Sequence, residues 1–126
     1  MAPRVLYIED NLDNLILVRR LMAAEGIELL EAVTGRDGLA MAQENQPDLI
    51  LVDINMPDLD GLIVTEKLRE MSHLDKVPIV ALTANIMRDV LERAMKVGCD
   101  GYIPKPIQVD EFPETIYGYL KNGRRG

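Results

Sequence analysis

The chain has 126 residues, the length of one average domain, and a chain of this size buries about two-thirds of its unfolded surface around a single core. Hydrophobic residues make up 48% of the chain and charged residues 28%, which excludes a disordered or fibrous protein. With 21 acidic and 14 basic residues the formal net charge is -7, and this charge disfavours general binding to nucleic-acid phosphates.

Short apolar runs alternate with longer amphipathic segments along the whole chain. The short runs have the length of β-strands, and the longer segments repeat their apolar residues at the helical period of about 3.6. Strict alternation of the two is typical of a parallel α/β sheet. We therefore expect five strands, each followed by a helix, at residues 5–8, 27–32, 49–52, 79–82 and 101–103.

The composition of the five runs predicts their places in the sheet. The first, third and fourth are entirely apolar, which is typical of central strands that are covered on both faces. The second run carries two glutamates, and the fifth is followed by Pro104, which cannot donate a hydrogen bond to a neighbouring strand. We expect these two at the edges. The doubly wound order 2-1-3-4-5, with right-handed crossovers and helices on both faces, satisfies this placement.

Several residues predict where the helices begin and end. Thr34 precedes an aspartate by three residues, as in a helix-starting capping box, and Gly26 and Gly98 stand where the first and fourth helices should stop. Pro113 lies inside the apolar pattern of the last helix, where a proline removes an amide donor. We expect the regular part of that helix to start near Pro113 and residues 109–112 to form an irregular turn.

Polar side chains follow four of the five predicted strands. Glu9 and Asp10 follow the first, Asp53 the third, Thr83 the fourth, and Lys105 the fifth. In open parallel sheets ligands bind at the carboxyl ends of the strands, where the strand order reverses, which here is between the first and third strands. Three close carboxylates repel one another unless a cation offsets their charge, and ligands that are all oxygen suit Mg²⁺. The sequence therefore predicts a magnesium site.

These residue types also support phosphoryl chemistry. A carboxylate such as Asp53 can attack phosphorus and form an aspartyl phosphate. Mg²⁺ and Lys105 would share the charge that builds on the phosphoryl oxygens, with a hydrogen bond donated by Thr83. Because the modified side chain carries a charge near -2 in place of -1, it can bias a loop with two conformations.

The motifs at the strand ends closely resemble the receiver domain of two-component response regulators, over essentially the whole chain. The resemblance implies a flavodoxin-like receiver fold. We expect one domain over residues 1–126 with a core at about 3–121 and, because only six residues follow the last predicted helix, no output domain. The motifs that carry it are Glu9-Asp10, Asp53-Ile54-Asn55-Met56-Pro57-Asp58-Leu59-Asp60-Gly61, Thr83-Ala84 and Lys105-Pro106.

The resemblance implies a role for each residue of the phosphoryl site. Asp53 would accept the phosphoryl group from a phosphohistidine on a sensor histidine kinase or a histidine phosphotransfer protein. Lys105 would contact a phosphoryl oxygen, and its peptide bond to Pro106 would be cis, which costs least before proline. Thr83 and Tyr102 would form the switch pair, in which the hydroxyl moves to the phosphoryl group and the aromatic ring turns inward.

The same resemblance implies how the cofactor is held. Asp10, Asp53 and the backbone carbonyl of Asn55 would bind Mg²⁺, and Glu9 would act through a water molecule. Asn55 and Asn85, two residues after the acceptor and after the switch threonine, match positions that tune the lifetime of the phosphoryl group in this family.

The fourth predicted helix carries more apolar residues than one buried face requires. Either the helix has a wide core face, or Leu91 and Met95 stay partly exposed beside Tyr102 and dock a partner. The family's usual output face, built by helix 4, strand 5 and helix 5, would bind a downstream protein, with the chain a monomer or a phosphorylation-linked dimer. The helix is predicted to include Ile86, Met87, Val90, Leu91, Ala94, Met95 and Val97.

Two other functions remain open. The chain could be a phosphorelay intermediate or the receiver segment of a hybrid kinase, in which Asp53 relays the phosphoryl group. An Mg²⁺-dependent phosphohydrolase would share Asp53 and Lys105, but it would need a second acid where Asn55 stands. We therefore expect a switch with self-catalysed phosphotransfer and dephosphorylation rather than an enzyme.

The remaining signals concern location and redox state. The apolar runs are too short for a membrane span or a secretory signal, so no membrane contact is expected. The single Cys99 and the single His73 cannot supply an internal disulfide or a Cys/His zinc site, and we read Cys99 as a small buried hydrophobe and His73 as solvated. These features predict a cytoplasmic chain.

Overall fold

The computed structural model describes residues 2–56 and 59–124 of the chain. Five parallel strands form one sheet in the order β2-β1-β3-β4-β5, as the apolar runs predict. The sequence of elements is β1 (Arg4–Ile8), α1 (Leu12–Ala24), β2 (Glu28–Ala32), α2 (Gly35–Glu44), β3 (Leu49–Asp53), α3 (Gly61–Arg69), a short 3₁₀ turn (Ser72–Leu74), β4 (Ile79–Thr83), α4 (Arg88–Val97), β5 (Gly101–Pro104) and α5 (Phe112–Asn122).

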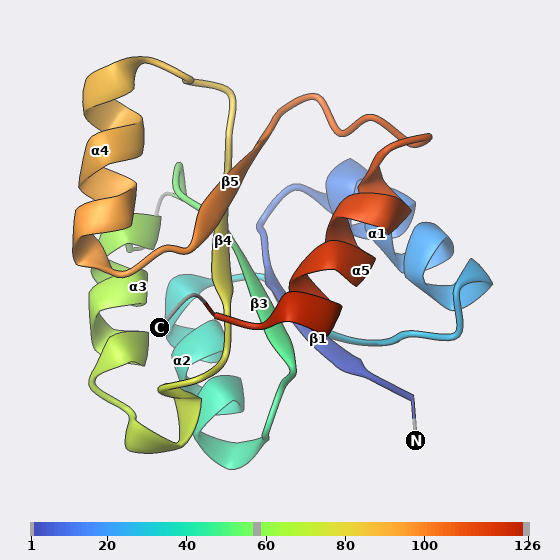
Figure 1. Ribbon diagram of the computed structural model, residues 1–126, viewed down its shortest axis with the longest axis horizontal. Helices are drawn as coiled ribbons and strands as arrows, with labels where there is room; N and C mark the ends of the chain where they lie inside the picture. Colours follow the sequence, from blue (N-terminus) through green and yellow to red (C-terminus); the bar gives the residue numbers. More distant parts are fainter. Residues whose placement is uncertain (1, 57–58, 125–126) are drawn as a thin grey trace.

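The helices cover the sheet on both faces, with α1 and α5 on one side and α2, α3 and α4 on the other (Figure 1). Side chains alternate between the faces of a strand, so each face of the sheet has its own core. Val5 and Tyr7 of β1 pack with α1 and α5, whereas Leu6 and Ile8 pack with the other three helices. Almost all residues of the three central strands are buried, which is why these strands read as continuous apolar runs.

The helix ends follow the local signals in the sequence. The Thr34 side chain accepts a hydrogen bond of 3.0 Å from the Asp37 amide at the start of α2. Gly98 ends α4 with a φ of 120°, a left-handed conformation that favours glycine. Pro113 lies in the first turn of α5, where backbone amides have no partner within the helix, so the missing amide of proline costs no helical hydrogen bond. The preceding residues 109–111 form a turn. The expected helix start near Pro113 is confirmed.

The prediction for the fourth helix is wrong at its start. Ile86 and Met87 precede α4 and are 59% and 65% exposed. The Asn85 side chain accepts a hydrogen bond of 3.0 Å from the Met87 amide, which forms a turn in place of the first helical turn. The wide core face is also wrong, because the buried residues of α4 are Val90 and Ala94.

Within the described part of the chain, none of the helices is long and apolar enough to cross a membrane. The two solitary residues lie as expected. Cys99 is buried in the core beside the Thr65 hydroxyl, and His73 is exposed, with its Nε2 atom 2.8 Å from the Ala42 carbonyl oxygen.

Candidate functional site

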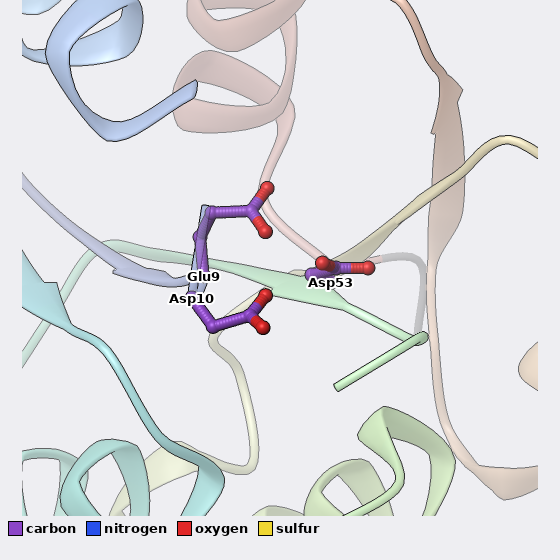
Figure 2. A group of neighbouring side chains, drawn as sticks. All are labelled: Glu9, Asp10 and Asp53. Atoms are coloured by element: carbon purple, nitrogen blue, oxygen red, sulfur yellow. The ribbon is translucent and has the colours of Figure 1, made fainter. Parts of the chain in front are cut away.

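The carboxyl ends of β1 and β3 bring three acidic side chains together. The register pairs Ile8 with Val52, so the residues that follow β1 lie beside the last residue of β3. Figure 2 shows the carboxyl groups of Glu9 and Asp10 directed toward Asp53. One oxygen from each of the three lies within 4.8 Å of the others. Glu9 and Asp53 are buried, and Asp10 is exposed.

Lys105 joins this group from the opposite end of the chain. The Lys105 amide donates to the Thr83 carbonyl, which places the residue directly after β5 on the same rim of the sheet. Its Nζ atom lies 2.9 Å from Glu9 Oε1 and 3.1 Å from Asp53 Oδ2, and the Lys105–Pro106 peptide bond is cis. The ammonium therefore offsets part of the negative charge that β1 and β3 bury together.

Two further side chains contact Glu9, and sequence reasoning missed both. The Tyr7 hydroxyl donates to Glu9 Oε1 at 2.8 Å, and Asn14 Nδ2 of α1 donates to the same oxygen at 3.2 Å. A signal for Tyr7 is present in the sequence, since Tyr7 and Glu9 are two residues apart and point to the same side of the strand. A phenol in a buried apolar run also needs a hydrogen-bond partner.

The buried carboxyls of Glu9 and Asp53 interact, and their pKa values are shifted in opposite directions. Burial, a hydrogen bond with Glu9 and the Glu9 charge together raise the pKa of Asp53 to about 6, against the opposing effects of Lys105 and of the Asn55 amide, which donates to Asp53 Oδ1 at 2.9 Å. Burial also acts to raise the pKa of Glu9, but hydrogen bonds from Asp53, Lys105 and Tyr7 outweigh it, and that pKa is lowered. Of the two carboxyls, Asp53 is therefore the one that takes up a proton as the pH falls toward 6, and it is mostly ionised at neutral pH.

The match to known proteins covers nearly the whole chain. A sequence model of the response regulator receiver domain matches residues 5–117. This chain belongs to the response regulator receiver family. The polar-differentiation response regulator DivK of Brucella ovis is 42% identical over 120 residues, which cover 95% of this chain and 98% of DivK. Receivers of this family are signalling switches of two-component systems and not classical enzymes.

Two solved receiver structures show the same fold. The chemotaxis response regulator CheY4 of Vibrio cholerae has a TM-score of 0.90 at 27% identity, over 94% of this chain and 98% of that one. The receiver domain of a sensor histidine kinase from Pseudomonas aeruginosa has a TM-score of 0.88 at 26% identity, over 97% of this chain and 100% of its own. That receiver was solved with a magnesium ion coordinated in its active-site cleft.

Four other predicted residues have neighbours outside the acidic cluster. The Thr83 hydroxyl is buried; it donates to the Asn85 carbonyl at 3.0 Å and accepts from the Asn85 amide at 2.9 Å. Tyr102 of β5 is 44% exposed. It lines a groove with the half-buried Leu91 and the half-exposed Met95 of α4. The structure thus joins Lys105 to the acidic receiver site, whereas Thr83 bonds to Asn85 and the other three side chains line a groove.

The loop after Asp53 packs against the end of β3, next to the acidic site. Residues 57–58, part of its predicted turn, lie outside the described residues. Asp60 begins α3 by accepting a hydrogen bond of 2.8 Å from the Leu62 amide. The next residue, Gly61, packs so closely that a Cβ there would overlap the Asp53 carbonyl oxygen and the Ile54 Cα. A glycine at this position lets the receiver loop close against the end of β3.

We expect Gly61→Ala to lower the free energy of unfolding by about 1–3 kcal/mol, because the neighbouring atoms are backbone and cannot rotate away. Gly118→Ala is the matched control. Gly118 lies in α5 with open space around its Cβ position, so alanine there should stabilise by about 0.5–1 kcal/mol. Urea unfolding of both variants measures the difference, and equal stability of the two would contradict the close approach.

Proposed function

We propose that Asp53 accepts a phosphoryl group from a phosphohistidine on a sensor histidine kinase or a histidine phosphotransfer protein. One observation carries the proposal: a buried carboxylate at the end of β3 lies 3.1 Å from the Lys105 ammonium and beside two further carboxylates. An acidic group that retains a fixed ammonium suits a reaction in which negative charge arrives and is stabilised.

We further propose Mg²⁺ as the cofactor. The donor set fits this ion, since carboxylate oxygens of Glu9, Asp10 and Asp53 converge and Mg²⁺ prefers oxygen ligands. Asp10, Asp53 and the backbone carbonyl of Asn55 would hold the ion, and Glu9 would act through a water molecule. When bound, Mg²⁺ supplies positive charge that aligns the phosphoryl oxygens and offsets the charge of the carboxylates.

The transfer itself uses the side chains of the rim. An oxygen of the ionised Asp53 carboxylate forms the new bond to phosphorus as the bond from phosphorus to the donor imidazole breaks. Lys105, already 3.1 Å from Asp53 Oδ2, binds a phosphoryl oxygen and stabilises the added charge. Because the pKa of Asp53 is about 6 without metal, the nucleophile is mostly ionised at neutral pH.

The signal would then leave through Thr83 and Tyr102. The Thr83 hydroxyl exchanges its backbone partners at Asn85 for a phosphoryl oxygen, and this movement frees space into which the Tyr102 ring turns. Such a change alters the surface of α4, β5 and α5, including Leu91 and Met95, on which a downstream protein docks. Asn55 and Asn85 flank the phosphoryl position and tune the lifetime of the modification.

Incubation with a small acyl phosphate and Mg²⁺, followed by intact mass measurement, tests the proposed function. The wild-type protein should gain the mass of one phosphoryl group, and Asp53→Asn should gain none, because an amide is not a nucleophile for phosphorus. Asp75→Asn is the matched control at an exposed site in the turn after the 3₁₀ helix, and it should gain the same mass as wild type. An adduct on Asp53→Asn, or none on wild type, would overturn the assignment.

A further inference from the structure

Tyr7 is the polar exception in a buried strand. Its side chain is fully buried on the face of the sheet covered by α1 and α5, and its hydroxyl donates to Glu9 Oε1 at 2.8 Å. Burial raises the pKa of the phenol far above its ordinary value, so Tyr7 stays a neutral hydrogen-bond donor. Leaving a buried hydroxyl without a partner destabilises a protein, so the bond to Glu9 is strongly favoured.

Besides the hydrogen bond with Asp53, the donors around Glu9 are distributed unequally between its two oxygens. Oε1 accepts from the Tyr7 hydroxyl at 2.8 Å, from Lys105 Nζ at 2.9 Å and from Asn14 Nδ2 at 3.2 Å. Oε2 is approached by the Asn11 amide at 3.5 Å, the limit of a hydrogen bond. Three donors saturate Oε1 from strand β1, helix α1 and the segment after β5, and they hold the carboxylate by that oxygen.

We propose that Tyr7, assisted by Asn14, is a positioning residue that orients the Glu9 carboxylate so that its second oxygen faces the Mg²⁺ position. This inference rests on the proposed function and adds residues that touch neither the cation nor the phosphoryl group. Lys105 alone cannot hold the Glu9 carboxylate in this orientation. Its ammonium is shared with Asp53 and moves toward the phosphoryl group, so Glu9 needs donors that remain in place when Lys105 leaves.

Tyr7→Phe tests the proposal because it removes one oxygen and keeps the packed ring. The Mg²⁺ dissociation constant is measured for the unphosphorylated protein by the shifts of the Asn11 and Asn55 amide resonances. We expect Tyr7→Phe to bind Mg²⁺ about tenfold more weakly, as is typical when a group that orients a ligand is removed. Tyr117→Phe is the matched control, since its hydroxyl donates at 2.9 Å to the carbonyl of Glu25, which directly follows α1 and lies away from the acidic site. Its affinity should equal that of wild type.

Asn14→Ala is a second test variant, and it leaves the buried strand β1 unchanged because Asn14 lies in α1. This substitution keeps the Asn14 backbone amide, which donates a hydrogen bond of 3.0 Å to the Asn11 side chain at the start of α1. Because its bond to Glu9 is longer, we expect a smaller loss, about threefold. Urea unfolding shows whether Tyr7→Phe is folded. If it is not, Asn14→Ala alone tests the proposal, by its Mg²⁺ affinity and by a Glu9 carboxyl ¹³C chemical shift that should differ from wild type.

Two results would overturn the positioning role. One is a Tyr7→Phe or Asn14→Ala protein that folds and binds Mg²⁺ as tightly as wild type, and the other is an equal loss of affinity in Tyr117→Phe. Phosphoryl adduct formation at saturating Mg²⁺ separates the two proposals. A wild-type adduct with unchanged Mg²⁺ affinity in either variant rejects the positioning role and leaves Asp53 as acceptor, whereas absence of the adduct on wild type rejects the proposed function.

Discussion

Asp53→Asn should raise the free energy of unfolding by about 2–3 kcal/mol near pH 8 in a metal-free buffer. Burial, with the hydrogen bond and the charge of Glu9, raises the pKa of Asp53 from 3.8 to about 6, so the folded protein holds this proton more tightly than the unfolded chain does. The contribution of Asp53 to stability is therefore fully present below pH 4 and is lost as the pH rises through about 6. A pKa difference of this size corresponds to about 3 kcal/mol, and asparagine mimics the neutral acid at every pH.

Urea unfolding at a series of pH values, with a chelator present, measures this effect. The advantage of Asp53→Asn over wild type should be greatest above pH 6 and should disappear toward pH 4, where wild-type Asp53 is itself neutral. Asp75→Asn, at an exposed position, should follow wild type throughout. If Asp53→Asn is less stable than wild type near pH 8, the ion pair with Lys105 outweighs the cost of burying the charge, and the explanation fails.

The same measurement connects stability with the cofactor. A cation that binds only the folded protein stabilises it in proportion to the logarithm of its concentration over its dissociation constant. Adding Mg²⁺ should therefore stabilise wild type more than Asp53→Asn and narrow the gap between them. On this explanation the acidic rim lowers the stability of the metal-free protein, because the charges that destabilise it would be the ligands of the proposed cation.

Asp100→Ala should lower the free energy of unfolding by about 3–5 kcal/mol, because it leaves buried donors without a partner. The Asp100 side chain is 9% exposed and accepts hydrogen bonds from Arg69 Nη2 at 2.7 Å, from the Ile79 amide at 2.9 Å and from Arg124 Nε at 3.1 Å. The Arg69 side chain is 11% exposed, so its charge would stay buried and unpaired. This carboxylate therefore links α3, β4 and the segment after α5.

Arg88→Ala is the matched control for Asp100→Ala. Arg88 forms an ion pair of 2.9 Å with Glu92, but the two side chains are 92% and 64% exposed, and such a pair contributes at most about 0.5 kcal/mol. Asp100 precedes β5, at the end of the sheet opposite the acidic rim, so Mg²⁺ affinity should be unchanged in Asp100→Ala. A loss of stability as small as that of Arg88→Ala, measured by urea unfolding, would contradict the structural role of Asp100.

The sequence by itself determined the order of the sheet and the rim on which the site lies. Continuous apolar runs mark strands covered on both faces, and the glutamates of β2 and the proline that ends β5 mark edges, because solvent exposure and amide donation are local properties of each strand. Once the order is known, residues that follow β1, β3 and β5 must share one rim. The grouping of Glu9, Asp10, Asp53 and Lys105 followed from that alone.

Only the tertiary structure decided which side chains contact one another. The triple hydrogen bonding of Glu9 Oε1 depends on the rotamers of Tyr7, Asn14 and Lys105, and Lys105 is 96 residues away along the chain. The start of α4 could not be predicted from the apolar pattern either, since the Asn85 side chain accepts the hydrogen bond of the Met87 amide and competes with the helix for it. A sequence pattern reports the period of burial along one element. Pairwise contacts between elements depend on register, helix position and rotamer, which are determined only when the faces of the sheet are packed.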